Sequence, residues 1–148
     1  MKIRAARSDD LDAIKELLEA NGLPFSDVNA ALLNSFLLAE DGDGTVVGSV
    51  GLERFGNNAL LRSLVVTPAA RKDGLGGNLV ARAEDVARGS GVSELWLLTT
   101  TAADFFRRAS YVVVDRAAAP VEVQVSAQFA ALCPASAVCL KKKLNYFP

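Results

Sequence analysis

The chain has 148 residues, of which 16 are Lys or Arg and 17 are Asp or Glu, so its net charge is −1. Because the one basic run, residues 141–143, is short, this balance argues against a general nucleic-acid-binding protein. The sequence has no histidine and only two cysteines, which excludes a Ser-His-Asp triad, a histidine-based metal site and a disulfide scaffold.

Length and hydropathy predict one domain over residues 1–148, because the chain is long enough to bury a core of its own. The first residues lack the apolar core of a signal peptide, and no apolar run approaches the roughly 20 residues of a membrane helix. We therefore expect a cytoplasmic protein with neither a membrane nor a nucleic acid as partner.

The first half of the chain predicts alternating strands and helices. A strand at residues 2–6 precedes a helix that begins at Ser8, since acidic residues favour a first turn, and ends at Gly22. Pro24 opens a weaker helical segment that extends to about residue 34. Two apolar runs, residues 36–39 and 46–55, flank the turn-forming residues 40–44 and predict an antiparallel hairpin.

The second half predicts a parallel pair of strands and a final antiparallel part. Strands at residues 59–67 and 92–100 flank a helix at 74–88, an arrangement that requires a right-handed crossover. A helix at 102–109, begun by a capping box of Thr101 and Asp104, a strand at 111–116, a helix at 120–132 and a strand at 137–144 follow. The fold class is α/β (α+β), with a mixed, mostly antiparallel sheet flanked by helices.

The glycine-rich turn after residues 59–67 has the composition of an anion-binding loop. Gly74, Gly76 and Gly77 let an anion approach the unpaired amides of a helix start, while Arg71 and Lys72 add positive charge. A P-loop requires Gly-Lys-Ser/Thr and a dinucleotide fingerprint requires three glycines at fixed spacing, and this turn contains neither. A pyrophosphate fits the remaining description.

The pattern Arg71-x-x-Gly74-x-Gly76, directly after a buried strand, resembles the acetyl-CoA loop of the GNAT superfamily of N-acetyltransferases. The resemblance implies the acyl-CoA N-acyltransferase fold, in which the two parallel strands splay apart, with acetyl-CoA as cosubstrate and no metal. It also implies a pantetheine-binding strand and a pyrophosphate loop. The implied cofactor-binding residues are Leu64, Val65, Val66, Arg71, Lys72, Asp73, Gly74, Leu75, Gly76 and Gly77.

One motif departs from the family pattern. Many members carry Ala-x-x-Phe-Tyr-x-x-x-Gly-Phe, whose Tyr protonates the departing thiolate, but Phe106 stands at the Tyr position and Ser110 at the Gly position. We expect Tyr111 to pack as a core aromatic and Ser110 to strain the turn. Because CoA thiolate is a good leaving group, we still expect direct transfer in a ternary complex without this tyrosine. The alternative is a non-catalytic acyl-CoA sensor.

Glu53 is the candidate catalytic base, because an incoming ammonium must lose a proton before it attacks and Glu53 lies on the third predicted strand. Two alternatives remain open. A chain of water molecules could take the proton, and Glu53 could be a solvated strand residue.

A narrower resemblance concerns the acceptor. The segment Leu-Leu-Thr-Thr-Thr-Ala at 97–102, followed by Phe105 and Phe106, resembles the acetyltransferase domain of N-acetylglutamate synthases. With residues 61–64 and 133–139 it also resembles small acetyltransferases of arsenic-resistance operons. This implies a small-molecule partner, the α-amine of an acidic amino acid or of a glutamate analogue of the phosphinothricin or arsinothricin type.

An acidic acceptor requires cations for its anionic groups, and Arg62, Arg54 and Arg107 are the candidate substrate-binding residues. Arg62 interrupts an apolar strand, although it could instead face solvent.

The competing interpretation is an acetyltransferase that acts on protein or peptide amines. The two thiols, Cys133 and Cys139, are interpreted as buried apolar side chains rather than arsenic ligands, and pairing of edge strands into a homodimer is left open.

Overall fold

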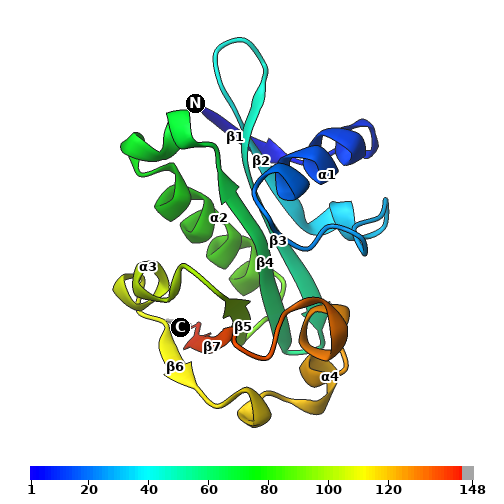
Figure 1. The fold of residues 1–148 in the computed structure, drawn as a ribbon, viewed down its shortest axis with the longest axis vertical. Helices are drawn as coiled ribbons and strands as arrows, with labels where there is room; N and C mark the ends of the chain where they lie inside the picture. Colours follow the sequence, from blue (N-terminus) through cyan, green and yellow to red (C-terminus); the bar gives the residue numbers. More distant parts are fainter. Residues whose placement is uncertain (145–148) are drawn as a thin grey trace. The chain divides into compact units, whose positions relative to one another are not determined.

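The computed structural model describes residues 1–144, except for the side chains of Lys72 and Asp73. Its strands form a mixed sheet in the hydrogen-bonded order β1-β2-β3-β4-β5-β7-β6 (Figure 1). The strands are β1 (Lys2–Ala5), β2 (Phe36–Glu40), β3 (Val46–Phe55), β4 (Asn58–Val66), β5 (Glu94–Thr99), β6 (Val112–Val114) and β7 (Val138–Lys143). Since β4 and β5 are parallel while β1–β2, β2–β3, β5–β7 and β6–β7 are antiparallel, the expected fold class is confirmed.

The chain forms two compact units. Strands β3 and β4 and helix α2 (Leu75–Gly89) each contribute residues to both units. The first unit comprises Met1–Glu53 and Arg62–Asp85, and the second comprises Arg54–Leu61 with the chain from Val86 onward. Each is described separately below. One domain over residues 1–148 remains a prediction.

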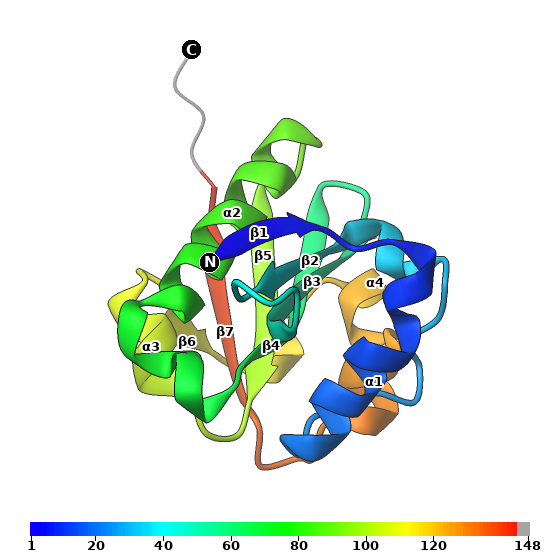
Figure 2. The ribbon, with the colours of Figure 1, turned by 90° about the horizontal axis from the view of Figure 1, so that it is seen from above.

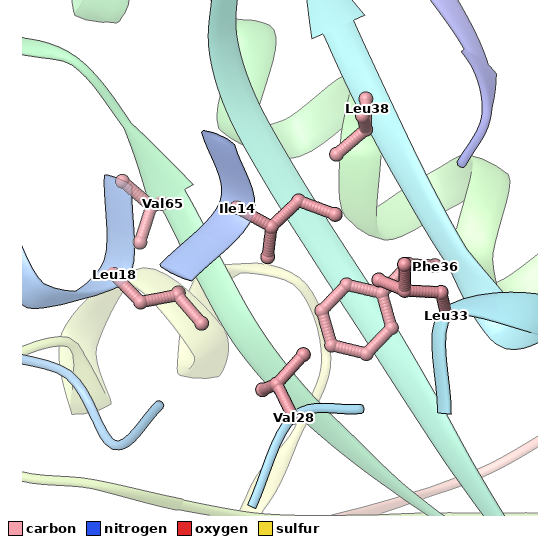
Figure 3. Packing of buried hydrophobic residues seen from close by; sticks show 7 residues of the cluster. All are labelled: Ile14, Leu18, Val28, Leu33, Phe36, Leu38 and Val65. Atoms are coloured by element: carbon pink, nitrogen blue, oxygen red, sulfur yellow. The ribbon is translucent and has the colours of Figure 1, made fainter. Parts of the chain in front are cut away.

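In the first unit, helices lie on the two faces of the strands. Helix α1 (Leu11–Ala20) buries Ile14 and Leu18 against Phe36 and other apolar side chains on one face (Figure 3). Helix α2 (Leu75–Gly89) lies on the opposite face (Figure 2), where a Cβ added at Gly48 would be 3.1 Å from the Leu79 side chain. Strand alternation explains this arrangement, because successive side chains point to opposite faces.

Gly51 on β3 leaves room for the Phe36 ring of β2. It is the cross-strand partner of Phe36, and a Cβ at this position would overlap the phenyl ring, which fills the space above the glycine. The ring then packs with Val28 and Leu33 on the face that α1 covers.

The second unit has its own apolar cluster. Its buried members are Leu60, Trp96, Ala119, Val123, Phe129 and Cys139. The Trp96 indole Nε1 donates to Asn58 Oδ1 at 3.2 Å, which satisfies the polar edge of this buried ring system. The parallel ladder joins residues 58–60 to residues 94–96, and β7 pairs with β5 on its other side.

The weak helix predicted from Pro24 to residue 34 is wrong. The segment contains turns and a short 3-10 helix at Leu32–Ser35, and the Asn29 side chain accepts a hydrogen bond from the Leu32 amide at 2.9 Å. Asn, Ser and Asp side chains compete with the backbone in this way and disfavour a continuous helix. Val28 and Leu33 nevertheless reach the core from this irregular segment.

The predicted helix over residues 120–132 is broken. Helix α4 (Val121–Gln124) stops at once, and a π-helical turn at Gln128–Leu132 follows. The Ser126 hydroxyl donates to the Val123 carbonyl at 2.6 Å, a local bond that replaces helix continuation. The β-branched residues of this segment also lower its helix propensity.

The start of α3 (Ala103–Arg108) also differs from the expectation. No side chain caps this helix at its N-terminus, and the Thr101–Asp104 capping box is absent; instead Thr99 Oγ1 accepts from the amides of Thr101 and Ala102. At the other end Ser110 has φ of +76°, a left-handed conformation that glycine adopts without strain. Strain at Ser110 is therefore confirmed.

Candidate acyl-transfer site

Arg62 is the centre of a buried ion cluster on β4. Its Nη1 and Nη2 donate to the two carboxylate oxygens of Asp27 at 2.5 and 2.6 Å, and Nη1 also donates to Glu53 Oε1 at 3.2 Å. Its Nε donates to Ser63 Oγ at 3.1 Å. The guanidinium thus joins the irregular segment after α1 to β3 and β4, all within the first unit.

The exposure of the cluster is unequal. The Arg62 side chain is 0% exposed, whereas the side chains of Asp27 and Glu53 are 20% and 23% exposed. The pKa of Arg62 is raised: burial alone would lower it, but the bonds to Asp27 and Glu53 outweigh burial. The hydrogen bond from Arg62 is the main reason why the pKa of Asp27 is lowered, against an opposing effect of desolvation. Both shifts favour the ionised forms of Arg62 and Asp27 at neutral pH.

The backbone beside this cluster is unusual. Ser63 lies within β4 yet has φ of +58°, and its carbonyl accepts a hydrogen bond from the buried Ser49 Oγ at 2.7 Å. A left-handed residue other than glycine costs on the order of 1 kcal/mol and requires support from its surroundings. The bonds from Arg62 and Ser49 supply that support immediately before Leu64.

The glycine loop has the geometry of a helix start. A 3-10 turn at Pro68–Asp73 leads to Gly74, whose φ of +70° is left-handed, and α2 begins at Leu75. The first helical hydrogen bond runs from the Asn78 amide to the Gly74 carbonyl at 3.1 Å, so the amides of residues 75–77 precede it. Such amides, with the positive end of the helix dipole, favour an anion.

The structure brings several predicted cofactor residues together in the first unit. Arg71 is exposed, and its Nε donates to the carbonyl of Val66 at 2.9 Å, which ties the loop to the end of β4. A Cβ added at Gly74 or Gly77 would meet no atom within 4 Å, so the loop is open at both glycines. The side chains of Lys72 and Asp73 lie outside what the structure describes. The cofactor-binding roles themselves remain predictions.

The other two predicted substrate cations belong to the second unit. Arg54 is exposed, and its Nη2 donates to the Ser90 carbonyl at 2.8 Å. Arg107 on α3 is exposed and forms an ion pair with Asp104 at 3.0 Å. Arg62, by contrast, holds the carboxylates of its own chain rather than facing solvent, so a substrate carboxylate could bind its guanidinium only by displacing Asp27.

Two aromatic side chains of the family motif, Phe106 and Tyr111, pack as core, whereas Ser110 is exposed. Phe106 and Tyr111 are buried, with their rings edge to face and centroids 5.4 Å apart, and Lys142 Nζ lies 5.4 Å from the Tyr111 ring.

Burial raises the pKa of Cys139 to about 11, which keeps this thiol protonated. Within residues 1–144, no three His, Cys, Asp or Glu side chains gather where they could hold a metal ion.

Sequence reasoning did not single out Asp27. The residue lies in the segment that was predicted as a helix, and no motif surrounds it. The one available signal was Arg62 itself, because an arginine inside an apolar strand requires a carboxylate partner. The sequence could not say which carboxylate that is.

Comparison with known proteins assigns these features to a family. Residues 8–111 match the family model described as the acetyltransferase (GNAT) family. The chain belongs to this family. The enzyme class predicted from the glycine loop, an acetyl-CoA-dependent N-acetyltransferase, is thereby confirmed.

Solved structures with this fold include three relatives of low identity. N-acetylglutamate synthase from Neisseria gonorrhoeae, solved with coenzyme A and N-acetyl-glutamate, has a TM-score of 0.84 and 24% identity, over 98% of this chain and 35% of its own. Rv2747 from Mycobacterium tuberculosis, solved with CoA, has a TM-score of 0.80 and 23% identity, over 98% of this chain and 100% of its own. The PaiA N-acetyltransferase from Thermoplasma acidophilum, solved with coenzyme A, has a TM-score of 0.68 and 18% identity, over 96% and 98%.

These likenesses concern the fold, since the identities are below 25%. The chain spans about a third of the length of the N-acetylglutamate synthase chains that it matches. A search of curated proteins found no match. Among the helices of residues 1–144, none has the length and apolar character needed to cross a membrane.

Proposed function

We propose that this acetyltransferase transfers the acetyl group of acetyl-CoA to the α-amine of a small acidic amino acid or glutamate analogue. Transfer proceeds by direct attack in a ternary complex. The observation that carries the proposal is the Arg62 cluster, because it supplies a carboxylate, Glu53, beside the distorted part of β4 that precedes the expected pantetheine strand.

On the donor side, the pantetheine arm pairs with the backbone of Leu64, Val65 and Val66, and the pyrophosphate binds the amides that precede the first hydrogen bond of α2. The open space at Gly74 and Gly77 supports this placement. The exposed guanidinium of Arg71, held at the end of β4, adds a positive charge for a phosphate group.

On the acceptor side, the amine arrives as an ammonium ion and must lose one proton. Glu53 accepts that proton. The bond that it accepts from Arg62 through Oε1 occupies one of about four lone-pair sites of the carboxylate, which leaves others available for this step. The amine nitrogen then attacks the thioester carbon, the carbon–sulfur bond breaks, and CoA leaves as thiolate. Because Phe106 replaces the family's tyrosine, departure without a dedicated acid relies on orientation of the reactants.

The acidic acceptor is supported by the sequence motif at residues 97–102 and by the fold shared with N-acetylglutamate synthase. Arg54 and Arg107, the two predicted substrate cations of the second unit, are both exposed. A cationic acceptor, such as a polyamine or a peptide amine, is the second candidate. It is favoured by the two carboxylates of the Arg62 cluster, which outnumber its one cation.

The test is release of thiol from acetyl-CoA by the purified protein with a panel of amines. The panel contains glutamate, phosphinothricin, arsinothricin, aspartate, polyamines and lysine peptides. Turnover confined to the glutamate-like amines supports the proposal, whereas turnover confined to polyamines or peptides supports the second candidate. Binding of acetyl-CoA without turnover on any amine contradicts both and favours a sensor.

The matched control is Gly76→Asp, which places a negative side chain on the expected pyrophosphate path. We expect this variant to lose acetyl-CoA binding while it keeps the thermal unfolding profile of the wild type. Unchanged binding in a folded variant would refute the glycine loop as the cofactor site.

A further inference from the structure

We propose that Asp27 acts with Glu53 as the binding site for the ammonium group of the acceptor amine. This assignment rests on the proposed function, since it names the group that recognises the acceptor. It adds a residue that no motif indicates, and it makes Asp27 a specificity-determining residue rather than only a counter-ion for Arg62.

The first argument is accessibility. A molecule that reaches this cluster meets carboxylate oxygens, because the Asp27 and Glu53 side chains are partly exposed and that of Arg62 is fully enclosed. A guanidinium with no exposed surface cannot receive a substrate carboxylate without rearrangement. The accessible chemistry is therefore that of an anion, which recognises a cation.

The second argument is hydrogen-bond capacity. A carboxylate offers about four lone-pair sites, and the bidentate bond from Arg62 uses one on each oxygen of Asp27. Glu53 accepts one bond from the same guanidinium, through Oε1. The two carboxylates thus retain acceptor sites for the three N–H donors of an ammonium group.

The third argument is charge. One guanidinium and two carboxylates sum to −1, and the lowered pKa of Asp27 keeps that carboxylate ionised. Because Asp27 and Glu53 share one guanidinium, the cluster keeps a net charge of −1 if Asp27 serves only to neutralise Arg62. An ammonium group restores neutrality.

The same unit contains a matched cluster that serves as the control. Arg4 is held by Asp10 in a bidentate pair at 2.8 and 2.9 Å and by Glu40 at 3.1 Å. All three residues line an open pocket, so an amine could reach them too. Asp10 accepts from the Arg7 amide at 2.6 Å, which ties it to the 3-10 turn at Ser8–Asp10 that precedes α1, whereas the backbone amide that bonds Asp27 is its own.

The experiment compares Asp27→Asn with Asp10→Asn by calorimetric binding to the protein loaded with CoA. The probes are L-glutamate, glutarate, which keeps the carboxylates but lacks the amine, and 1,5-diaminopentane, which has amines only. We expect Asp27→Asn to weaken binding of both amines about tenfold or more and to leave glutarate binding unchanged or improved. Asp10→Asn should bind all three probes as the wild type does, and Asp27→Glu should restore amine binding.

Several results would overturn the proposal: equal amine binding by Asp27→Asn and the wild type, an equal loss in the two Asn variants, or no binding of either amine to the wild type. Tighter binding of L-glutamate by Asp27→Asn would show that Asp27 competes with a substrate carboxylate for Arg62. If the acceptor is not acidic but the Asp27 assignment holds, the result is different. The wild type then binds 1,5-diaminopentane and not L-glutamate, and Asp27→Asn still weakens the binding of 1,5-diaminopentane.

A wild-type measurement covers the case in which Asp27→Asn does not fold. The carboxyl ¹³C resonance of Asp27 should shift when 1,5-diaminopentane is titrated into the CoA complex, and that of Asp10 should not. The absence of any Asp27 shift at saturating amine would equally overturn the assignment.

Discussion

Two arginines of the first unit are each held by two carboxylates, yet the surroundings give the two clusters different roles. Arg4 lies on β1, the edge strand of the sheet, and its bidentate partner Asp10 also accepts from a backbone amide. Arg62 lies within the sheet, on β4, and its partner Asp27 comes from an irregular segment. The same ion-pair chemistry thus fixes a helix start in one place and forms a candidate site in the other, according to what else the carboxylates bind.

The strongest test of this contrast removes each guanidinium. Arg62→Met removes the buried cation that Asp27 and Glu53 share, and we expect it to lower the free energy of unfolding by about 3–5 kcal/mol. Arg4→Met should cost less, about 1–2 kcal/mol, because Asp10 keeps the hydrogen bond from the Arg7 amide when the guanidinium is removed. Urea unfolding at neutral pH measures both, and equal losses would argue against a special environment at Arg62.

Acid titration tests the Arg4 cluster by a second property. The bond from Arg4, opposed by desolvation and helped by the Arg7 amide, lowers the pKa of Asp10 from 3.8 to about 2. A lowered folded-state pKa stabilises above the unfolded value, and that contribution is lost as the pH falls through about 2. It amounts to about 2.5 kcal/mol, since the shift from 3.8 to about 2 is worth about 1.4 kcal/mol for each pKa unit.

Asp10→Asn should therefore be less stable than the wild type at pH 7 and should lose less stability between about pH 4 and pH 2. Unfolding measured at several pH values checks this expectation. An unchanged slope in the variant would show that Asp10 does not control acid sensitivity.

A smaller effect is expected at Ser63, which has no counterpart beside Arg4. Ser63→Ala removes the acceptor of the Arg62 Nε proton and leaves a buried donor unpaired, at a cost of about 1–2 kcal/mol. Ser8→Ala, at an exposed position, is the matched control and should lie within about 0.5 kcal/mol of the wild type. Thermal unfolding distinguishes the two, and a neutral Ser63→Ala would remove the proposed support of the β4 distortion.

The smallest expected effect concerns the other left-handed serine. Ser110 is exposed and has φ of +76°, so Ser110→Gly should relieve strain and stabilise the protein by about 0.5–1 kcal/mol. The same change at Ser63 should not stabilise, because it also removes the bond to Arg62. Melting temperatures of the two glycine variants provide the comparison, and a stabilising Ser63→Gly would mean that this bond contributes little.

Much of the fold follows from local sequence signals. Turn residues at 40–44, the apolar run before Gly74 and the Arg71-x-x-Gly74-x-Gly76 pattern define strands, loop and helix because each depends on neighbouring residues. The segments at 24–34 and 120–132 could not be predicted as well. Their Ser and Asn side chains bond to nearby backbone, as at Asn29 and Ser126, and tertiary packing decides the outcome.

The candidate site divides in the same way. The donor side consists of backbone amides and glycines, which a contiguous motif encodes. The acceptor side depends on an ion cluster whose members are far apart in the sequence, with 35 residues between the positions of Asp27 and Arg62. Glu53 and Arg62 were predicted as functional residues, but their pairing with each other and with Asp27 required the fold.

The most direct test of the account compares Glu53→Gln with Glu40→Gln, the corresponding carboxylates of the two clusters, in the thiol-release assay with the best amine of the panel. If Glu53 removes the ammonium proton, Glu53→Gln should lower kcat about 100-fold or more and change the pH profile of kcat, while its KM for acetyl-CoA stays unchanged. Glu40→Gln should match the wild type in every parameter. A Glu53→Gln enzyme with wild-type kcat and pH profile, or equal losses in both variants, would contradict acyl transfer at the Arg62 cluster.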